Sequence, residues 1–187
     1  QMLLTELYYD KQDFTQAQKF ARQLLDMEFE DHNDAGYFRK ERAYSIIGNA
    51  LLQEKKFQEA AETFAAGLKQ YPRSGESANM AFSRAFAEFN GEDYETSIKS
   101  FESYLKDFSN DRNNIHGQYY MAHAHQVLTQ FEASAEKFGA LAERYPDSNY
   151  AEEALFLVGE NYFNERSFAK AAEAYLKLLD HYPKGKY

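Results

Sequence analysis

Histidine is the commonest metal ligand and a frequent acid–base catalyst, and three of the five histidines in this chain lie close together in sequence. They are His116, His123 and His125. A helical zinc site needs two ligands four residues apart, so that both face the same side of the helix. His123 and His125 are two residues apart and would therefore point in different directions. We predict that these histidines hold no metal.

The other residue types that carry out catalysis are absent or wrongly placed. The chain has no cysteine, which excludes thiol nucleophiles and cysteine-based zinc sites. The segment 107–114 lacks the glycine and the terminal glutamate of a calcium loop, and we interpret it as a turn before a helix. Glu152 and Glu153 are interpreted as first-turn acids that the helix dipole favours. Because catalysis needs groups that converge, we predict a protein that is not an enzyme and uses no cofactor.

Charge and hydropathy exclude two further roles. The net charge is −9, with 21 Lys and Arg against 30 Asp and Glu. Both halves of the chain are acidic, so there is no basic patch for phosphates, and nucleic-acid binding is disfavoured. The longest apolar run, residues 154–159, is far shorter than the ~20 residues that span a bilayer. No transmembrane segment is predicted.

The residues that remain are organised by a repeat of 37 residues. Pro72, Pro146 and Pro183 are spaced 74 and 37 apart, and Ser109 occupies the vacant position. Three aromatic columns share this period, in a chain of which 17% is aromatic. Their members are Phe57, Tyr94, Phe131 and Phe168; Phe64, Phe101, Phe138 and Tyr175; and Tyr71, Phe108, Tyr145 and Tyr182. Such agreement between columns indicates true internal repetition.

Each repeat is predicted to be a pair of helices. Columns seven residues apart, with small or aliphatic residues between them, form one face of a helix, over 57–71, 94–108, 131–145 and 168–182. The first helix of each pair carries a small residue where a neighbour approaches, namely Gly48, Ala85, Ala122 and Gly159. Gly91 is predicted to cap the helix before it. We expect these columns to pack in the core.

The fold is therefore predicted to be all-α, a single array over residues 1–187. Its units are approximately 1–35, 36–73, 74–110, 111–147 and 148–187, with an acidic insertion near 28–34. Residues 183–187 parallel 146–150, where the next unit starts. We therefore expect a fragment of a longer array, with uncapped ends that offer a surface for self-association.

The last unit resembles the tetratricopeptide repeat (TPR) pattern. The matching positions are Leu155, Val158, Gly159, Tyr162, Phe168, Ala171, Tyr175 and Pro183. The period of 37 instead of 34, and the junction 145–150, are similar to the longer repeats of bacterial envelope TPR proteins. Examples are the lipoprotein of the outer-membrane β-barrel assembly machine and the Tol–Pal-associated cell-division coordinator. The resemblance implies a right-handed α-α superhelix, acting as a protein-interaction scaffold in the periplasm or at the outer membrane. A cytoplasmic location is the alternative.

The resemblance also implies where a partner binds, because first helices line the concave face in this family. The groove positions are Arg42, Asn49, Asn79, Phe82, Phe86, Phe89, Tyr119, His123, Phe156, Glu160 and Phe163. An aromatic groove with acidic edges suits a protein or peptide segment with apolar and basic residues. The alternative is a small molecule or lipid held in the aromatic concavity.

The third unit departs from the pattern at two positions. Arg84 occupies the position of Ile47 and Val158, and Glu88 that of Leu51 and Tyr162. Two interpretations stay open, namely tolerated drift of the repeat or a local polar contact with a partner.

Overall fold

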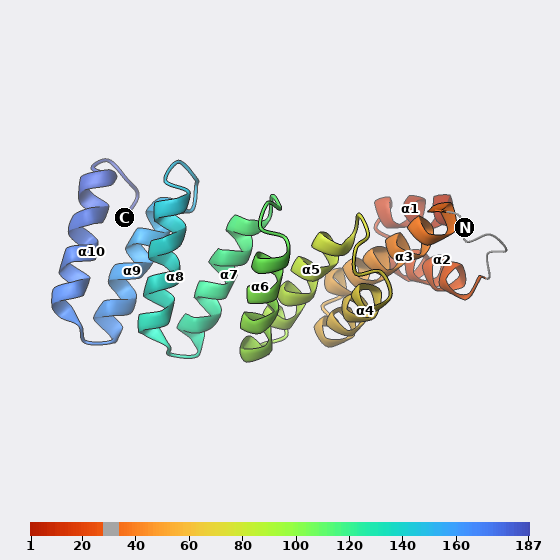
Figure 1. Cartoon of the computed structure of the whole chain (residues 1–187), viewed down its shortest axis with the longest axis horizontal. Coiled ribbons are helices and arrows are strands. Elements are labelled where there is room, and N and C mark those ends of the chain that lie inside the picture. Colours follow the sequence, from red (N-terminus) through yellow and green to blue (C-terminus); the bar gives the residue numbers. More distant parts are fainter. Residues whose placement is uncertain (28–33) are drawn as a thin grey trace. The chain divides into compact units, whose positions relative to one another are not determined.

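A computed structural model describes the backbone of residues 1–27 and 34–187, and the side chains of residues 1–27 and 40–187. The described residues form ten helices and no strand (Figure 1). The helices are α1 (Met2–Asp10), α2 (Phe14–Asp26), α3 (Asp34–Gln53), α4 (Phe57–Gln70), α5 (Ser77–Asn90), α6 (Tyr94–Asp107), α7 (Asn114–Val127), α8 (Phe131–Arg144), α9 (Ala151–Asn164) and α10 (Phe168–His181). The all-α helical repeat is confirmed. The predicted acidic insertion lies outside the described residues, apart from Asp34, which begins α3.

The four predicted second helices are α4, α6, α8 and α10. Each begins at the predicted aromatic residue and ends one residue earlier than predicted. The aromatic residue before the proline leaves the helix, as at Tyr71, where φ is −131°. Proline disfavours helical geometry in the residue that precedes it.

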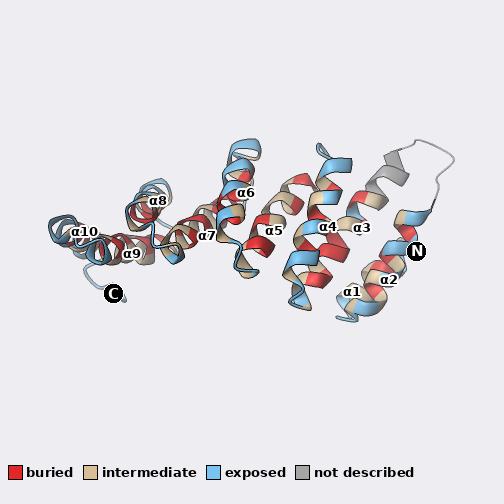
Figure 2. Ribbon diagram, turned by 90° about the horizontal axis from the view of Figure 1, so that it is seen from below, coloured by how far each residue is buried: buried red, intermediate tan, exposed pale blue. Residues whose placement is uncertain are grey.

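The chain divides into two compact units, Gln1–Thr96 and Ser97–Tyr187. In the first unit, α1 to α5 pack on one another in chain order, and the first helices α1, α3 and α5 also contact. In the second unit, α7 to α10 pack in the same consecutive way. Buried residues lie along one side of most helices and exposed residues along the other (Figure 2), as expected of amphipathic helices in a repeat stack.

The small column marks close helix contacts, as predicted. Gly48, Ala85, Ala122 and Gly159 are all buried. A methyl group added to Gly48 would lie 2.5 Å from the Cε1 and Cζ atoms of Phe64, and one added to Gly159 would meet the ring of Tyr175. The first helix of these two pairs therefore lies directly against the aromatic ring of the second.

The aromatic columns differ in depth, which the sequence pattern did not reveal. Phe64, Phe101 and Phe138 are completely buried, whereas Phe57, Tyr94 and Phe131 are half-buried and Phe168 is 59% exposed. Leu176 and Leu179 on α10 are also exposed. The expectation of a uniform core was therefore wrong for the first column. Helix α10 packs mainly on α9, where Ala171, Ala174 and Leu178 are buried, and its other face is exposed.

The turn between the helices of each pair contains a residue in the left-handed region, and it is never glycine. These residues are Gln12, Lys55, Glu92, Thr129 and Arg166, with φ between 57° and 64°. Gly91 caps α5 as predicted, and its N–H donates to the carbonyl of Ala87, but its φ is −81°. Glu92 takes the left-handed geometry instead. Non-glycine residues adopt it at a cost of ~1–2 kcal/mol, which helix packing must outweigh.

Candidate partner-binding surfaces

The predicted groove residues all lie on first helices and all reach the surface. In the first unit they are on α3 (Arg42, Asn49) and α5 (Asn79, Phe82, Phe86, Phe89). In the second they are on α7 (Tyr119, His123) and α9 (Phe156, Glu160, Phe163). Arg42 and Phe163 are exposed and the others are partly buried. Each unit thus carries its own surface of aromatic and polar side chains.

A carboxylate that the sequence did not single out organises the polar part of the first surface. Glu76 accepts hydrogen bonds from Nη1 of Arg42 at 2.7 Å, from the hydroxyl of Ser45 at 2.8 Å and from the amide of Asn79 at 3.3 Å. Burial alone would raise the pKa of Glu76, but the hydrogen bonds from Arg42 and Ser45 outweigh it and hold the pKa below its usual range. Arg42 and Asn79 are therefore held by an internal acid.

A second acid lies beside this network. Glu41 is only 3% exposed, and its Oε2 has no hydrogen-bond partner among the described residues. Burial raises the pKa of Glu41, a hydrogen bond with Ser74 partly offsets this rise, and the charge of Glu76 adds to it. The spacing of apolar residues along the sequence gave no sign that Glu41 is buried. Glu41 lies on α3, and the carboxylate of Glu76 approaches it only when the chain folds.

The aromatic part of the first surface is a stacked pair on α5. The rings of Phe82 and Phe86 lie 6.1 Å apart between centroids and are nearly parallel, at 8°. Phe89 instead packs its ring edge-on against Tyr94, at 5.4 Å. The predicted stripe of three phenylalanines thus divides into a stacked pair and a residue that packs across the turn.

In the second unit, Tyr119 is the centre of an aromatic cluster. Its ring lies 4.5 Å from that of His123, 4.9 Å from that of Tyr150 and 5.9 Å from that of Phe138. Its hydroxyl donates a hydrogen bond to Oε1 of Glu153 at 3.2 Å. Burial and the negative charge of Glu153 raise the pKa of Tyr119. Tyr150, which the sequence placed only in a junction, is a member of this site.

Burial also controls the charge of His123. It lowers the pKa of this imidazole, and the nearby Glu153 offsets only part of the change. His123 is therefore neutral at pH 7 and packs as an aromatic ring, with Phe138 5.0 Å away and edge-on. Among the described residues, no group of three or more His, Asp or Glu side chains is arranged to hold a metal ion.

The segment after α10 returns to α9 and covers part of its surface. The ring of Tyr187 stacks on Phe156 at 4.6 Å and 18°. The backbone N–H groups of Lys186 and Tyr187 both donate to Oε1 of Glu152, the second at 3.1 Å. In Figure 1 the C-terminus accordingly lies beside α9. The segment after α10 thus packs an aromatic side chain on a predicted groove residue.

The other two predicted groove residues on α9, Glu160 and Phe163, differ in the contacts that they make. Glu160 accepts a hydrogen bond from the hydroxyl of Tyr175. Burial and this hydrogen bond raise the pKa of Tyr175 to about 12. Phe163 is 55% exposed and contacts the ring of Phe168 edge-on at 5.5 Å. Phe163 therefore offers the most accessible ring on this helix.

Helix pairs repeated in this way define the class of tetratricopeptide repeat proteins, and solved structures of that class have the same fold. MamA matches with a TM-score of 0.76 and 13% identity, over 98% of this chain and 90% of its own. The TPR-like repeats of a kinesin light chain from Podosopora anserina match with 0.70 and 10%, over 100% and 95%. YrrB, described as a TPR protein with an unusual peptide-binding site, matches with 0.70 and 16%, over 96% and 84%.

The sequence itself identifies the family. The profile of the YfiO family of outer membrane lipoproteins matches residues 38–184, and the chain belongs to this family. No curated protein sequence matches the chain. None of the described helices is both long and apolar enough to cross a membrane.

Proposed function

We propose that this protein is a non-enzymatic scaffold that binds an extended segment of a partner protein on its first helices, in bacterial cell-envelope assembly. The observation that carries the proposal is the contact between residues 186–187 and α9. There, a stacked aromatic ring and two backbone N–H groups are held by Phe156 and Glu152. An aromatic anchor and hydrogen bonds from backbone N–H groups are two kinds of contact by which a peptide is recognised.

The chemistry of the surface favours a partner segment with aromatic and basic residues. Glu152, Glu153 and Glu160 all lie on α9 beside Phe156 and Phe163, and complementary charge supplies specificity and faster association. A periplasmic or outer-membrane-associated location is supported by the family to which the chain belongs. Peptide binding is supported by the description of YrrB.

A lipid or small-molecule ligand finds less support in the cavities. Two of them have volumes of about 480 and 470 Å³ and lie between packed helices. Both are lined mainly by small and charged residues, with Leu155 and Val158 also in the second, and each has one aromatic residue, Phe57 or Tyr162. An aromatic enclosure of the kind that a lipid would need is not offered by either cavity.

The proposal is tested by truncating one aromatic anchor in each unit. Loss of an anchor costs ~2 kcal/mol of binding, so Phe86→Ala and Phe156→Ala should each weaken capture of envelope partners roughly 30-fold. The control is Leu176→Ala, which removes an apolar side chain that is 67% exposed on α10. Capture is measured by quantitative mass spectrometry, with helicity checked by circular dichroism. Loss of capture in the control, with both phenylalanine variants unaffected, would place the site elsewhere.

A further inference from the structure

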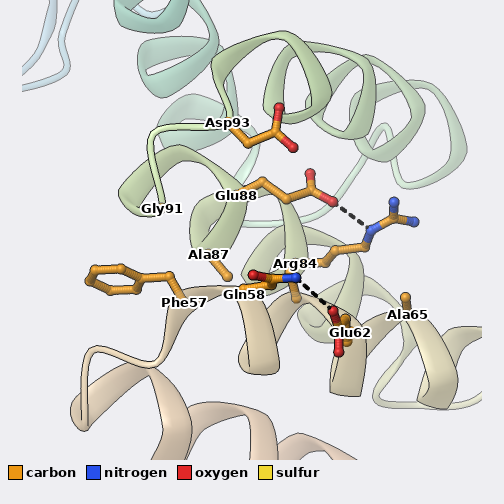
Figure 3. Close-up of a pocket in the computed structure, with 10 residues that line it drawn as sticks. Phe57, Gln58, Glu62, Ala65, Arg84, Ala87, Glu88, Gly91 and Asp93 are labelled. Atoms are coloured by element: carbon orange, nitrogen blue, oxygen red, sulfur yellow. Dashed lines mark hydrogen bonds and ion pairs between the residues drawn. The ribbon is translucent and has the colours of Figure 1, made fainter.

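A cavity of about 480 Å³ lies between α4 and α5 in the first unit, and none of the predicted groove residues lines it. Helix α4 contributes Phe57, Gln58, Ala61, Glu62 and Ala65, and α5 with its following turn contributes Arg84, Ala87, Glu88, Gly91 and Asp93 (Figure 3). Three of the charged groups are carboxylates and one is a guanidinium. The cavity is therefore acidic, and its volume is within the range of ligand pockets.

Glu88 is the feature of this cavity that packing does not explain. Its side chain is only 7% exposed, and its Oε1 accepts a hydrogen bond from Nε of Arg84 at 2.8 Å. Its other oxygen, Oε2, is buried and has no hydrogen-bond partner within the described parts of the chain. A buried carboxylate oxygen without a donor is strongly unfavourable. Glu88 therefore lines an acidic cavity, and one of its carboxylate oxygens has an unused capacity to accept a hydrogen bond.

The repeat shows that the fold does not need these two charges. At the same positions the preceding pair has Ile47 and Leu51, both buried, and the last pair has Val158 and Tyr162. A cavity of about 470 Å³ occurs between α8, α9 and α10 in the second unit, with Val158 and Tyr162 in its wall. The remaining pair has Met121 and His125 at these positions, so the ion pair of Arg84 and Glu88 occurs only at the cavity between α4 and α5 among these four repeats.

The other two carboxylates of the cavity, Asp93 and Glu62, already accept hydrogen bonds within the chain, and both can still attract a positive group. Oδ1 of Asp93 accepts the N–H of Thr96 at 3.2 Å, and Oε1 of Glu62 accepts the amide of Gln58 at 3.1 Å. Both carboxylates stay exposed. In Figure 3 the carboxylates of Asp93 and Glu88 point to the same side of the cavity. A positive group entering there would be attracted by all three acids.

We propose that the cavity between α4 and α5 binds a basic side chain, lysine or arginine, of a partner protein. Its ammonium or guanidinium group donates to Oε2 of Glu88, while the alkyl stem packs on Ala61, Ala65 and Ala87. Such a charged hydrogen bond to a carboxylate is stronger than a neutral one, and a partly buried position protects it from salt. None of the predicted groove residues of α3 and α5 lines this cavity, so its test can fail while the function proposed above still stands.

The test uses three capped tripeptides with the whole chain, followed by two-dimensional NMR of backbone amides. The probes are acetyl-Gly-Arg-Gly-amide, acetyl-Gly-Lys-Gly-amide and the uncharged citrulline analogue of the first. At about 10 mM, ten times a Kd of 1 mM, a basic tripeptide should shift amides of α4 and α5. The citrulline peptide should not. Absence of shifts with both basic peptides, or equal shifts with citrulline, overturns the proposal.

Two variants localise the effect. Glu88→Gln removes the charge with little change of shape and should weaken binding at least tenfold. Glu143→Gln, which removes an acid from the wall of the equivalent cavity in the second unit, should leave binding unchanged. Loss of binding in both variants, or in neither, shows attraction to the general negative charge of the chain and overturns the site.

A third variant separates binding from a structural role. The double change Arg84→Ile and Glu88→Leu introduces the pattern of the preceding repeat, and buried ion pairs can be replaced by apolar residues with no loss of stability. We expect a Tm equal to or above that of the wild type, together with complete loss of the peptide-induced shifts. A clear fall in Tm would show that the pair is needed for the fold, which would overturn the proposal.

Discussion

Replacing Gly48 by alanine tests whether the small column sets the distance between paired helices. The added methyl would lie 2.5 Å from two ring atoms of Phe64, and ordinary contact begins at 3.4 Å. Phe64 is completely buried, so its ring would have to withdraw by about 1 Å into a densely packed interior. Overpacking of this kind costs ~1–3 kcal/mol.

The intrinsic preference of the helix acts in the opposite direction. Alanine is favoured over glycine in a helix interior by ~1 kcal/mol, so Gly48→Ala should lower the free energy of unfolding by up to ~2 kcal/mol. Gly139→Ala is the matched control. It lies inside α8, and its methyl would meet only Cγ2 of Val158, at 3.9 Å. This variant should gain ~1 kcal/mol, and the difference between the two variants measures the overpacking alone.

Urea unfolding followed by circular dichroism gives both free energies, provided that the slope m is unchanged. The double variant Gly48→Ala with Phe64→Leu completes the experiment, because the smaller side chain leaves room for the methyl. In that background the alanine should be neutral or favourable. If Gly48→Ala is as stable as Gly139→Ala with Phe64 intact, the ring moves freely and the role of the column is refuted. Ala122 shows that a methyl fits this column beside the buried Phe138 of its own pair.

Three further predictions concern two acids and the depth of the core. Glu76→Gln should lower stability at pH 7 by ~1–3 kcal/mol. The stability that Glu76 supplies through its lowered pKa is present above its unfolded pKa and is lost as the pH falls through its folded pKa. Glu41→Gln should raise stability at pH 7, because a raised pKa means that the charged form opposes folding; urea unfolding between pH 4 and 8 checks both signs. Phe138→Ala should cost ~3–5 kcal/mol and the half-buried Phe131→Ala clearly less, and thermal melts that rank them equally would contradict the difference in burial.

The elements that the sequence predicted well are those fixed by local periodicity. The starts of α4, α6, α8 and α10 follow from the first aromatic column, and their ends follow from the effect of proline or its equivalent position. The cap at Gly91 was predicted correctly, but it does not use the left-handed conformation that glycine permits. The geometry of the turn places that conformation on the next residue, Glu92.

The surfaces were harder to predict because their chemistry depends on contacts between distant residues. Arg42 and Glu76 are 34 residues apart in sequence, and nothing in a helical pattern pairs them. The stacking of Tyr187 on Phe156 likewise requires the segment after α10 to return. The departure at Arg84 and Glu88 was visible only because the repeat supplies its own comparison with Ile47 and Leu51.

The left-handed turn residues also make this chain suitable for distance measurements by spectroscopy. Lys55, Glu92, Thr129 and Arg166 recur at intervals of 37, all are exposed, and their differing side chains show that the position tolerates many residue types. The chain has no native cysteine, so a pair of cysteines introduced at 55 and 166 would take fluorescent or spin labels without competing thiols. Because the backbone geometry is the same at each position, the labels would share one attachment geometry. A change in the distance between them on addition of a partner would report directly how the array bends when it binds.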